Sequence, residues 1–197
     1  MDPRDGLEGV VVASTRLSDV DGERGRLIIA GHDAEALAAT HSFEQVCGLL
    51  WGEPLGPGAL GPARVAAFAA LPTEALAMAD PMDALRASVA RLTEGPAAPA
   101  ALTGAVAVFT AAHHRLRQGL APVAPDPSLD HAADLLRMLS GDRPDPARAR
   151  ALGRYLVTVS DHGMNASTFA ARVVASTGSD MVSSVVAALG ALKGPLH

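Results

Sequence analysis

The sequence has few aromatic residues, one cysteine (Cys47) and one lysine (Lys193). Aromatic side chains make up 3% of the chain, whereas apolar residues as a whole make up 49%. A hydrophobic core must therefore be built from Ala, Val and Leu. Small side chains let helices approach closely, and Ala is the best helix former. This composition favours an all-α packing over a sandwich or a barrel.

Several function classes are excluded by what is missing. With Cys47 alone no intrachain disulfide can form, so we expect a reducing compartment and a buried, unreactive thiol. The net charge of −5 and the pI near 5.7 offer no basic surface for nucleic acid or an anionic membrane. No apolar run is long enough to span a bilayer, and the first residues lack a signal-peptide pattern. We therefore expect a cytoplasmic protein with no nucleic-acid or membrane partner.

The first part of the chain has a different pattern from the rest. Within residues 7–31, the β-branched stretch "GVVVASTRL" is followed by the turn cluster "SDVDGERG" and a second apolar run, "RLIIAG". Two apolar runs joined by a polar loop predict a β-hairpin. We therefore divide the chain into an N-terminal segment with a hairpin, residues 1–31, and a helical part, residues 32–197.

Helices with recognisable ends follow the hairpin. Asp33 is a candidate N-cap, Ser42 begins a capping box, and Gly52 ends the helix that the box opens. Later helices are entered through Ser128, Asn165 or Ser179 and end at a glycine. The last four helical segments are apolar over much of their circumference, which predicts that they lie at the centre of the fold. The expected segments are 34–40, 43–51, 61–71, 73–79, 81–95, 101–119, 128–141, 145–163, 165–178 and 179–194.

Two of the seven histidines are candidates for function. His162 and His197 each stand at a helix-breaking junction, where a side chain can face a cleft instead of a core. Asn165 begins a helix, and the exposed N–H groups of a helix start favour a carboxylate or phosphate. The alternative for this junction is an ordinary well-capped helix start. No third ligand stands at metal spacing, so we expect no metal site. Structural, capping or solvated roles are expected for His32, His41, His113, His114 and His131.

Three stretches carry a resemblance to a known family. The sequences "GLEGVVVASTRLSDVDGERGRL", "APVAPDPSLDHAADLLRML" and "NASTFAARVVASTGSDMVSSVVAALGALKGPLH" resemble bacterial citrate synthases and the related 2-methylcitrate synthases. The match covers nearly the whole chain in the family's order. It implies a mainly helical fold with a small N-terminal β element, a large domain holding a dimer interface, and a small domain that closes over the substrates.

The resemblance also implies a reaction and residue roles. The family condenses an acyl-CoA, usually acetyl-CoA, with oxaloacetate, an acyltransferase reaction of the tricarboxylic acid cycle that needs no further cofactor. His197 matches the enol-stabilising histidine of the family's "GPLHGG" stretch. His162 matches the oxaloacetate-binding histidine of its "DHE-N-S-T" stretch, and Asn165 would touch the same ligand. Gly163 stands where the family usually has glutamate.

The family continues beyond the histidine that matches His197. The ketone-polarising histidine, the aspartate base, the arginines that bind the dicarboxylate and most of the CoA pocket would lie in that continuation. On this reading residues 32–197 are a partial large domain, the small domain is absent, and we expect no measurable synthase activity from this chain alone. We expect a homodimer, or pairing with a chain that carries the C-terminal half. The alternatives are a non-catalytic interaction or regulatory protein, or a shortened chain whose end has no biological meaning.

Overall fold

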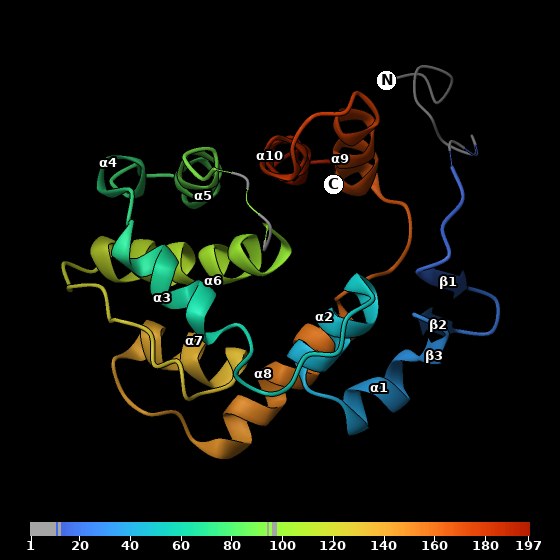
Figure 1. Ribbon diagram of the computed structural model, residues 1–197, viewed down its shortest axis with the longest axis horizontal. Coiled ribbons are helices and arrows are strands. Elements are labelled where there is room, and N and C mark those ends of the chain that lie inside the picture. The colour runs from blue at the N-terminus through green and yellow to red at the C-terminus, as the bar shows by residue number, and fades with distance from the viewer. Residues whose placement is uncertain (1–10, 12, 94, 96–97) are drawn as a thin grey trace.

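The computed structural model describes residues 11, 13–93, 95 and 98–197, which form a helical molecule with a small sheet near its N-terminal end (Figure 1). The expected fold class, all-α with a small N-terminal β element, is confirmed. The described strands are β1 (Ser18–Asp21), β2 (Arg26–Ile29) and β3 (His32–Asp33). The described helices are α1 (Ala34–Thr40), α2 (Phe43–Trp51), α3 (Gly61–Ala69), α4 (Thr73–Leu76), α5 (Pro81–Val89), α6 (Ala98–Arg117), α7 (His131–Ser140), α8 (Pro146–Thr158), α9 (Ala166–Ser176) and α10 (Met181–Leu192).

The hairpin is present, but its first strand lies later in the chain than expected. We placed that strand at residues 9–17; residues 11 and 13–17 are not in a strand, and the others of that range lie outside the described residues. The antiparallel pair is β1 with β2, and β3 adds a third strand in the order β1-β2-β3. Asp21 closes the loop by accepting a hydrogen bond from the Arg24 N–H, at 3.0 Å. Because the turn needs only residues 22–25, the polar residues before it remain available for β1.

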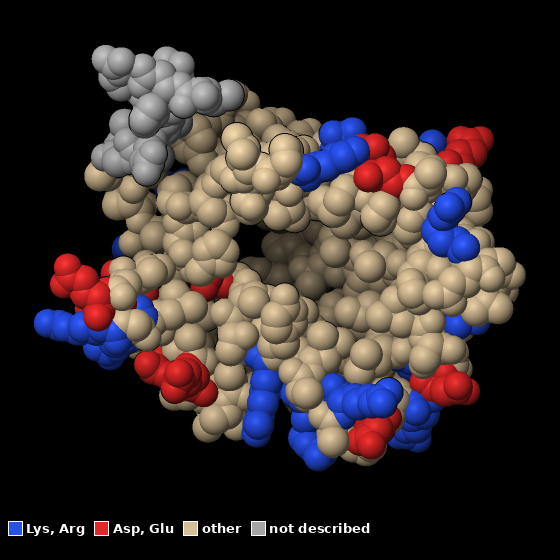
Figure 2. Space-filling view, turned by 180° about the vertical axis from the view of Figure 1, so that it is seen from behind, with Lys and Arg blue, Asp and Glu red and all other residues tan. Residues whose placement is uncertain are grey.

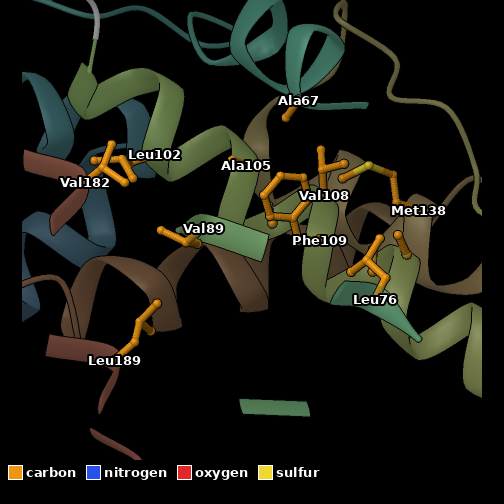
Figure 3. Packing of buried hydrophobic residues seen from close by; sticks show 13 residues of the cluster. Ala67, Leu76, Val89, Leu102, Ala105, Val108, Phe109, Met138, Val182 and Leu189 are labelled. Atoms are coloured by element: carbon orange, nitrogen blue, oxygen red, sulfur yellow. The ribbon is translucent and has the colours of Figure 1, made fainter. Parts of the chain in front are cut away.

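The main core forms around α6, the longest of the described helices. Leu102, Val108 and Phe109 of α6 are buried among side chains from α5, α7 and α10 (Figure 3). Gly104 lets α3 lie directly against this helix, since a Cβ built there would stand 2.9 Å from the backbone carbon of Ala63. Ala, Val and Leu fill most of this core, as the scarcity of aromatic residues predicted.

Helix caps agree with the sequence at the start of the chain and differ later. Asp33 caps α1, and Ser42 forms the predicted capping box with Gln45 at the start of α2. Asp130 caps α7 in place of the expected Ser128, because the Ser128 hydroxyl and N–H both donate to the Asp126 carboxylate, at 2.6 and 2.9 Å. At α10 the cap is likewise an aspartate, Asp180, instead of the preceding serine.

The prediction that the last four helical segments lie at the centre was wrong for α8 and α9, whereas α7 and α10 contribute Met138, Val182 and Leu189 to the main core. In the described part of the chain, α9 has no buried residue and α8 has Val157 alone. Val173 of α9 is 48% exposed, and Leu192 of α10 is 45% exposed. The apolar faces of these helices are therefore left partly uncovered. Figure 2 shows a hollow at the middle of one face of the molecule, with uncharged walls and charged residues near the outer edge.

One sequence prediction is not tested by the fold. The division into residues 1–31 and 32–197 stays a prediction. Among the described helices, none combines the length and apolarity that crossing a bilayer requires.

Candidate functional site

The loop between α8 and α9 carries His162 and is tied to the N-terminal sheet. Asp161 accepts hydrogen bonds from the Ser18 hydroxyl of β1, at 2.9 Å, and from the Gly163 N–H, at 2.8 Å. Gly163 has a φ of +85°, a left-handed conformation that glycine adopts at low cost. The hairpin and this short turn therefore fix the backbone on both sides of His162, whose side chain is exposed.

Four side chains form a continuous hydrogen-bonded row across the start of α9. The Asn165 amide nitrogen lies 3.2 Å from His162 Nε2, and Asn165 Oδ1 accepts from the Ser167 hydroxyl at 2.8 Å. The Ser167 hydroxyl lies 3.0 Å from His197 Nε2. Asn165 is also the N-cap of α9, where its Oδ1 accepts from the Thr168 N–H at 2.8 Å. The structure thus brings together the three predicted site residues, His162, Asn165 and His197; their chemical roles stay predictions.

The row fixes which ring nitrogens carry protons. An amide nitrogen can only donate, so His162 Nε2 accepts from Asn165 and is unprotonated. The single hydroxyl proton of Ser167 goes to Asn165, so Ser167 can only accept from His197. His197 Nε2 therefore carries a proton and is a hydrogen-bond donor at the exposed end of the row.

The C-terminal turn that carries His197 is held by an ion pair. Lys193, which follows α10, places its Nζ 2.5 Å from Asp83 Oδ2 and 3.4 Å from Asp80 Oδ1 at the start of α5. The hydrogen bond to Asp83 is the main cause that raises the pKa of Lys193. The His197 N–H then donates to the Gly194 carbonyl at 3.0 Å and closes the turn. The ion pair thereby sets where the turn leaves α10, and the turn directs His197 back toward α9.

A second polar group, buried between α3 and α7, was not found from the sequence. The Arg64 guanidinium donates from Nε to Asp134 Oδ2 at 2.7 Å, and neither side chain is exposed. His131 Nδ1 lies 3.3 Å from Arg64 Nη1. Burial, and next the charge of Arg64, lower the pKa of His131 to about 4, so this histidine is neutral. A buried arginine inside an alanine-rich helix gives no periodic signal that would distinguish it from a surface residue.

His113 and Cys47, for which we expected structural roles, are both buried. The His113 Nδ1 lies 3.1 Å from the Leu76 carbonyl oxygen. Cys47 is buried as expected, and burial, followed by the charge of Glu44, raises the pKa of its thiol to about 12. In the described residues, no three His, Cys, Asp or Glu side chains are grouped so that they could hold a metal ion.

Comparison with known proteins identifies the family that this arrangement belongs to. Residues 6–197 match the family described as citrate synthase, C-terminal domain. The chain is 38% identical to citrate synthase from Haloferax volcanii over 98% of its own length and 58% of that protein. It is 37% identical to 2-methylcitrate synthase from Mycobacterium tuberculosis over 100% of its own length and 55% of that protein. The chain belongs to the citrate synthase family.

Solved structures give the same result. Citrate synthase from Pyrobaculum aerophilum matches with a TM-score of 0.80 and 36% identity, over 98% of this chain and 56% of that one. Citrate synthase from Thermoplasma acidophilum, solved as a ternary complex with carboxymethyl coenzyme A and oxaloacetate, matches with a TM-score of 0.77 and 29% identity, over 98% of this chain and 56% of that one. The chain spans little more than half the length of the relatives it matches.

Proposed function

We propose that this chain supplies the oxaloacetate-binding histidine and the enol-stabilising histidine of a citrate synthase-type condensation. The reaction would join an acyl-CoA, acetyl-CoA or a close relative, to oxaloacetate. The observation that carries the proposal is the hydrogen-bonded row from His162 to His197, built from residues that match two separate family motifs. Membership of the citrate synthase family supports the reaction class.

His197 is proposed to stabilise the enol formed from the thioester. Removal of a proton from the acyl methyl group puts negative charge on the thioester oxygen. The His197 Nε2–H, which donates to Ser167, can transfer that hydrogen bond to the thioester oxygen. The turn held by Lys193 pre-orients the ring, which lowers the cost of arranging the donor at the moment of reaction.

His162 and Asn165 are proposed to bind oxaloacetate. His162 lies beside the N-terminal end of α9, where the helix dipole favours a negatively charged group. Asn165 already caps this helix and lies 3.2 Å from His162, so both side chains are held in place before a carboxylate binds to them. Because His162 Nε2 accepts from Asn165, the ring can offer its Nδ1–H as a donor to a carboxylate of oxaloacetate.

Other groups are needed to complete the reaction. The relatives extend well beyond the region that this chain matches, and the aspartate base is not assigned to any residue of this chain. A positioned general base contributes about 10²–10⁴ in rate, so we propose that residues 1–197 on their own give no measurable activity. We propose that this chain acts in a dimer, or together with a polypeptide carrying the remaining family region. The exposed apolar residues of α9 and α10 support such an assembly. We also place it in the cytoplasm.

Complementation tests the proposal. The chain would be co-expressed with the region of the Haloferax volcanii citrate synthase that follows the matched part, and CoA thiol release from acetyl-CoA and oxaloacetate would be measured. The proposal predicts thiol release by the purified complex and none by either part alone. A well-folded complex of the two parts that binds oxaloacetate and releases no thiol would reject it.

A further inference from the structure

A cavity lies between α1, α2, α7 and α8, and none of its lining residues belongs to the row from His162 to His197. Its volume is about 470 Å³, and it is walled by the end of α1 and the first turns of α2, α7 and α8. On α8 the lining residues are Pro146, Ala149, Arg150, Gly153 and Arg154, spaced three or four apart along one helix face. Gly153 has no side chain to fill the cavity. A Cβ built there would meet nothing nearer than the Ala132 Cβ, at 3.8 Å.

Three exposed arginines line this cavity, and one of them, Arg143, already interacts with a carboxylate: hydrogen bonds from Ser128, and to a smaller extent the charge of Arg143, lower the pKa of Asp126. Within the described part of the chain, none of Arg143, Arg150 and Arg154 makes a hydrogen bond or a close ion pair. Arg150 and Arg154 stand one helical turn apart, which separates their backbones by about 6 Å along the axis. Figure 2 shows Lys and Arg side chains, with some Asp and Glu among them, along the lower edge of the molecule, where α8 lies in Figure 1.

The two carboxylates of the cavity are already engaged. Glu44 is buried and accepts hydrogen bonds from the His131 N–H at 2.6 Å and the Gly58 N–H at 3.3 Å. Asp130 caps α7 by accepting from the Ala133 N–H at 2.7 Å. Neither forms an ion pair with an arginine of the cavity. Three helix starts converge on the same space, and their dipoles add to its positive potential.

We infer that this cavity binds a small molecule carrying two linked phosphate groups. Each guanidinium offers five N–H donors in a planar fork that matches the oxygens of a phosphate. Three such groups around one cavity provide more donors than a single phosphate or carboxylate can use, whereas a diphosphate can bridge Arg150 and Arg154 and reach Arg143. The inference does not depend on the reaction proposed above, because none of these residues belongs to the row from His162 to His197.

Isothermal titration calorimetry of the whole chain with inorganic pyrophosphate tests the inference. Orthophosphate and succinate serve as the single-phosphate and dicarboxylate comparisons. We expect pyrophosphate to bind with a Kd of about 1 mM or below, and to bind more tightly than both comparison ligands. Absence of pyrophosphate binding at ten times that concentration would overturn the inference, as would tighter binding of succinate.

Variants locate the site. The double variant R150Q/R154Q should weaken pyrophosphate binding by about 10-fold or more, since hydrogen bonds to charged groups are lost. Arg148→Gln is the matched control, because Arg148 is exposed on the same helix and does not line the cavity. If circular dichroism shows that the double variant does not fold, Arg143→Gln, which lies outside α8, replaces it with an expected loss of several-fold. Equal weakening by the cavity variants and by Arg148→Gln would overturn the assignment.

Discussion

The buried ion pair between Arg64 and Asp134 makes the sharpest prediction about stability. Arg64→Met removes the guanidinium from a site where both side chains have no exposure and the Nε–Oδ2 distance is 2.7 Å. The Asp134 carboxylate would keep the ion pair of its Oδ1 with Arg137, at 2.9 Å, but its buried Oδ2 would lose the Arg64 donor, and the Leu129 carbonyl would lose the donor that now lies 2.8 Å away. Breaking a buried pair by removing one partner costs about 3–5 kcal/mol. For a chain of this size that loss corresponds to about 6–20 °C in melting temperature.

A double-mutant cycle separates the cost of losing the Arg64–Asp134 interaction from the cost of lost packing. R64M, D134L and R64M/D134L would be compared by urea unfolding, followed by circular dichroism at pH 7.5. The double variant removes both charges, so we expect its loss to be smaller than the sum of the single losses by about 2 kcal/mol or more. Arg148→Met is the exposed control and should change stability by about 0.5 kcal/mol or less. Losses that simply add, or a loss below about 1 kcal/mol for R64M, would refute this reasoning.

Three other predictions follow from buried groups and close contacts. The pKa of His131 is lowered to about 4, whereas an unfolded histidine titrates near 6.5, so the free energy of unfolding should be retained above about pH 6.5 and fall by about 3 kcal/mol as the pH drops toward 4. In urea unfolding measured at several pH values, His131→Gln should remove this decrease with falling pH, and an unchanged pH dependence would contradict the prediction. Gly104→Ala should lower the free energy of unfolding by about 2 kcal/mol or more, because its Cβ would clash with the backbone of Ala63. Gly190→Ala, where a Cβ meets nothing within 4 Å, should raise it by up to about 1 kcal/mol. Thermal melts compare the two variants, and equal shifts in melting temperature would count against the clash. Cys47, with its thiol pKa raised to about 12, should react with a thiol reagent at pH 8 only after unfolding, and rapid labelling of the native chain would show that the thiol is accessible.

Local signals in the sequence predicted most of the helices and several of their ends. Ser42 and Gln45 form the predicted capping box because a capping box depends on residues three apart and on nothing else in the fold. Ser128 was predicted to cap α7 by the same rule, but a neighbouring aspartate accepts both of its donors and Asp130 takes its place. Local rules therefore hold until two candidate caps compete for the same turn.

The candidate site was predicted from two motifs that lie far apart in the chain. His162 and His197 were named because each stands where a helix must break, and that feature is local. Their link through Ser167 depends on how α9 packs against α10, which no local pattern specifies. The same limit applies to the burial of α8 and α9. Their apolar faces predicted a central position, but a face is buried only if another part of the protein covers it, and the described residues leave these faces largely open.

The rate of CoA thiol release by the complemented complex, measured for His197→Ala beside the unchanged chain at saturating acetyl-CoA and oxaloacetate, tests the central claim most directly. Loss of one hydrogen-bond donor to a developing oxyanion predicts a fall in kcat of about 10²–10³-fold, with the complex still assembled and oxaloacetate still bound. Arg148→Ala, at an exposed position in the first turn of α8, should leave the rate unchanged. An active complex whose rate is the same with and without the His197 imidazole would contradict the account.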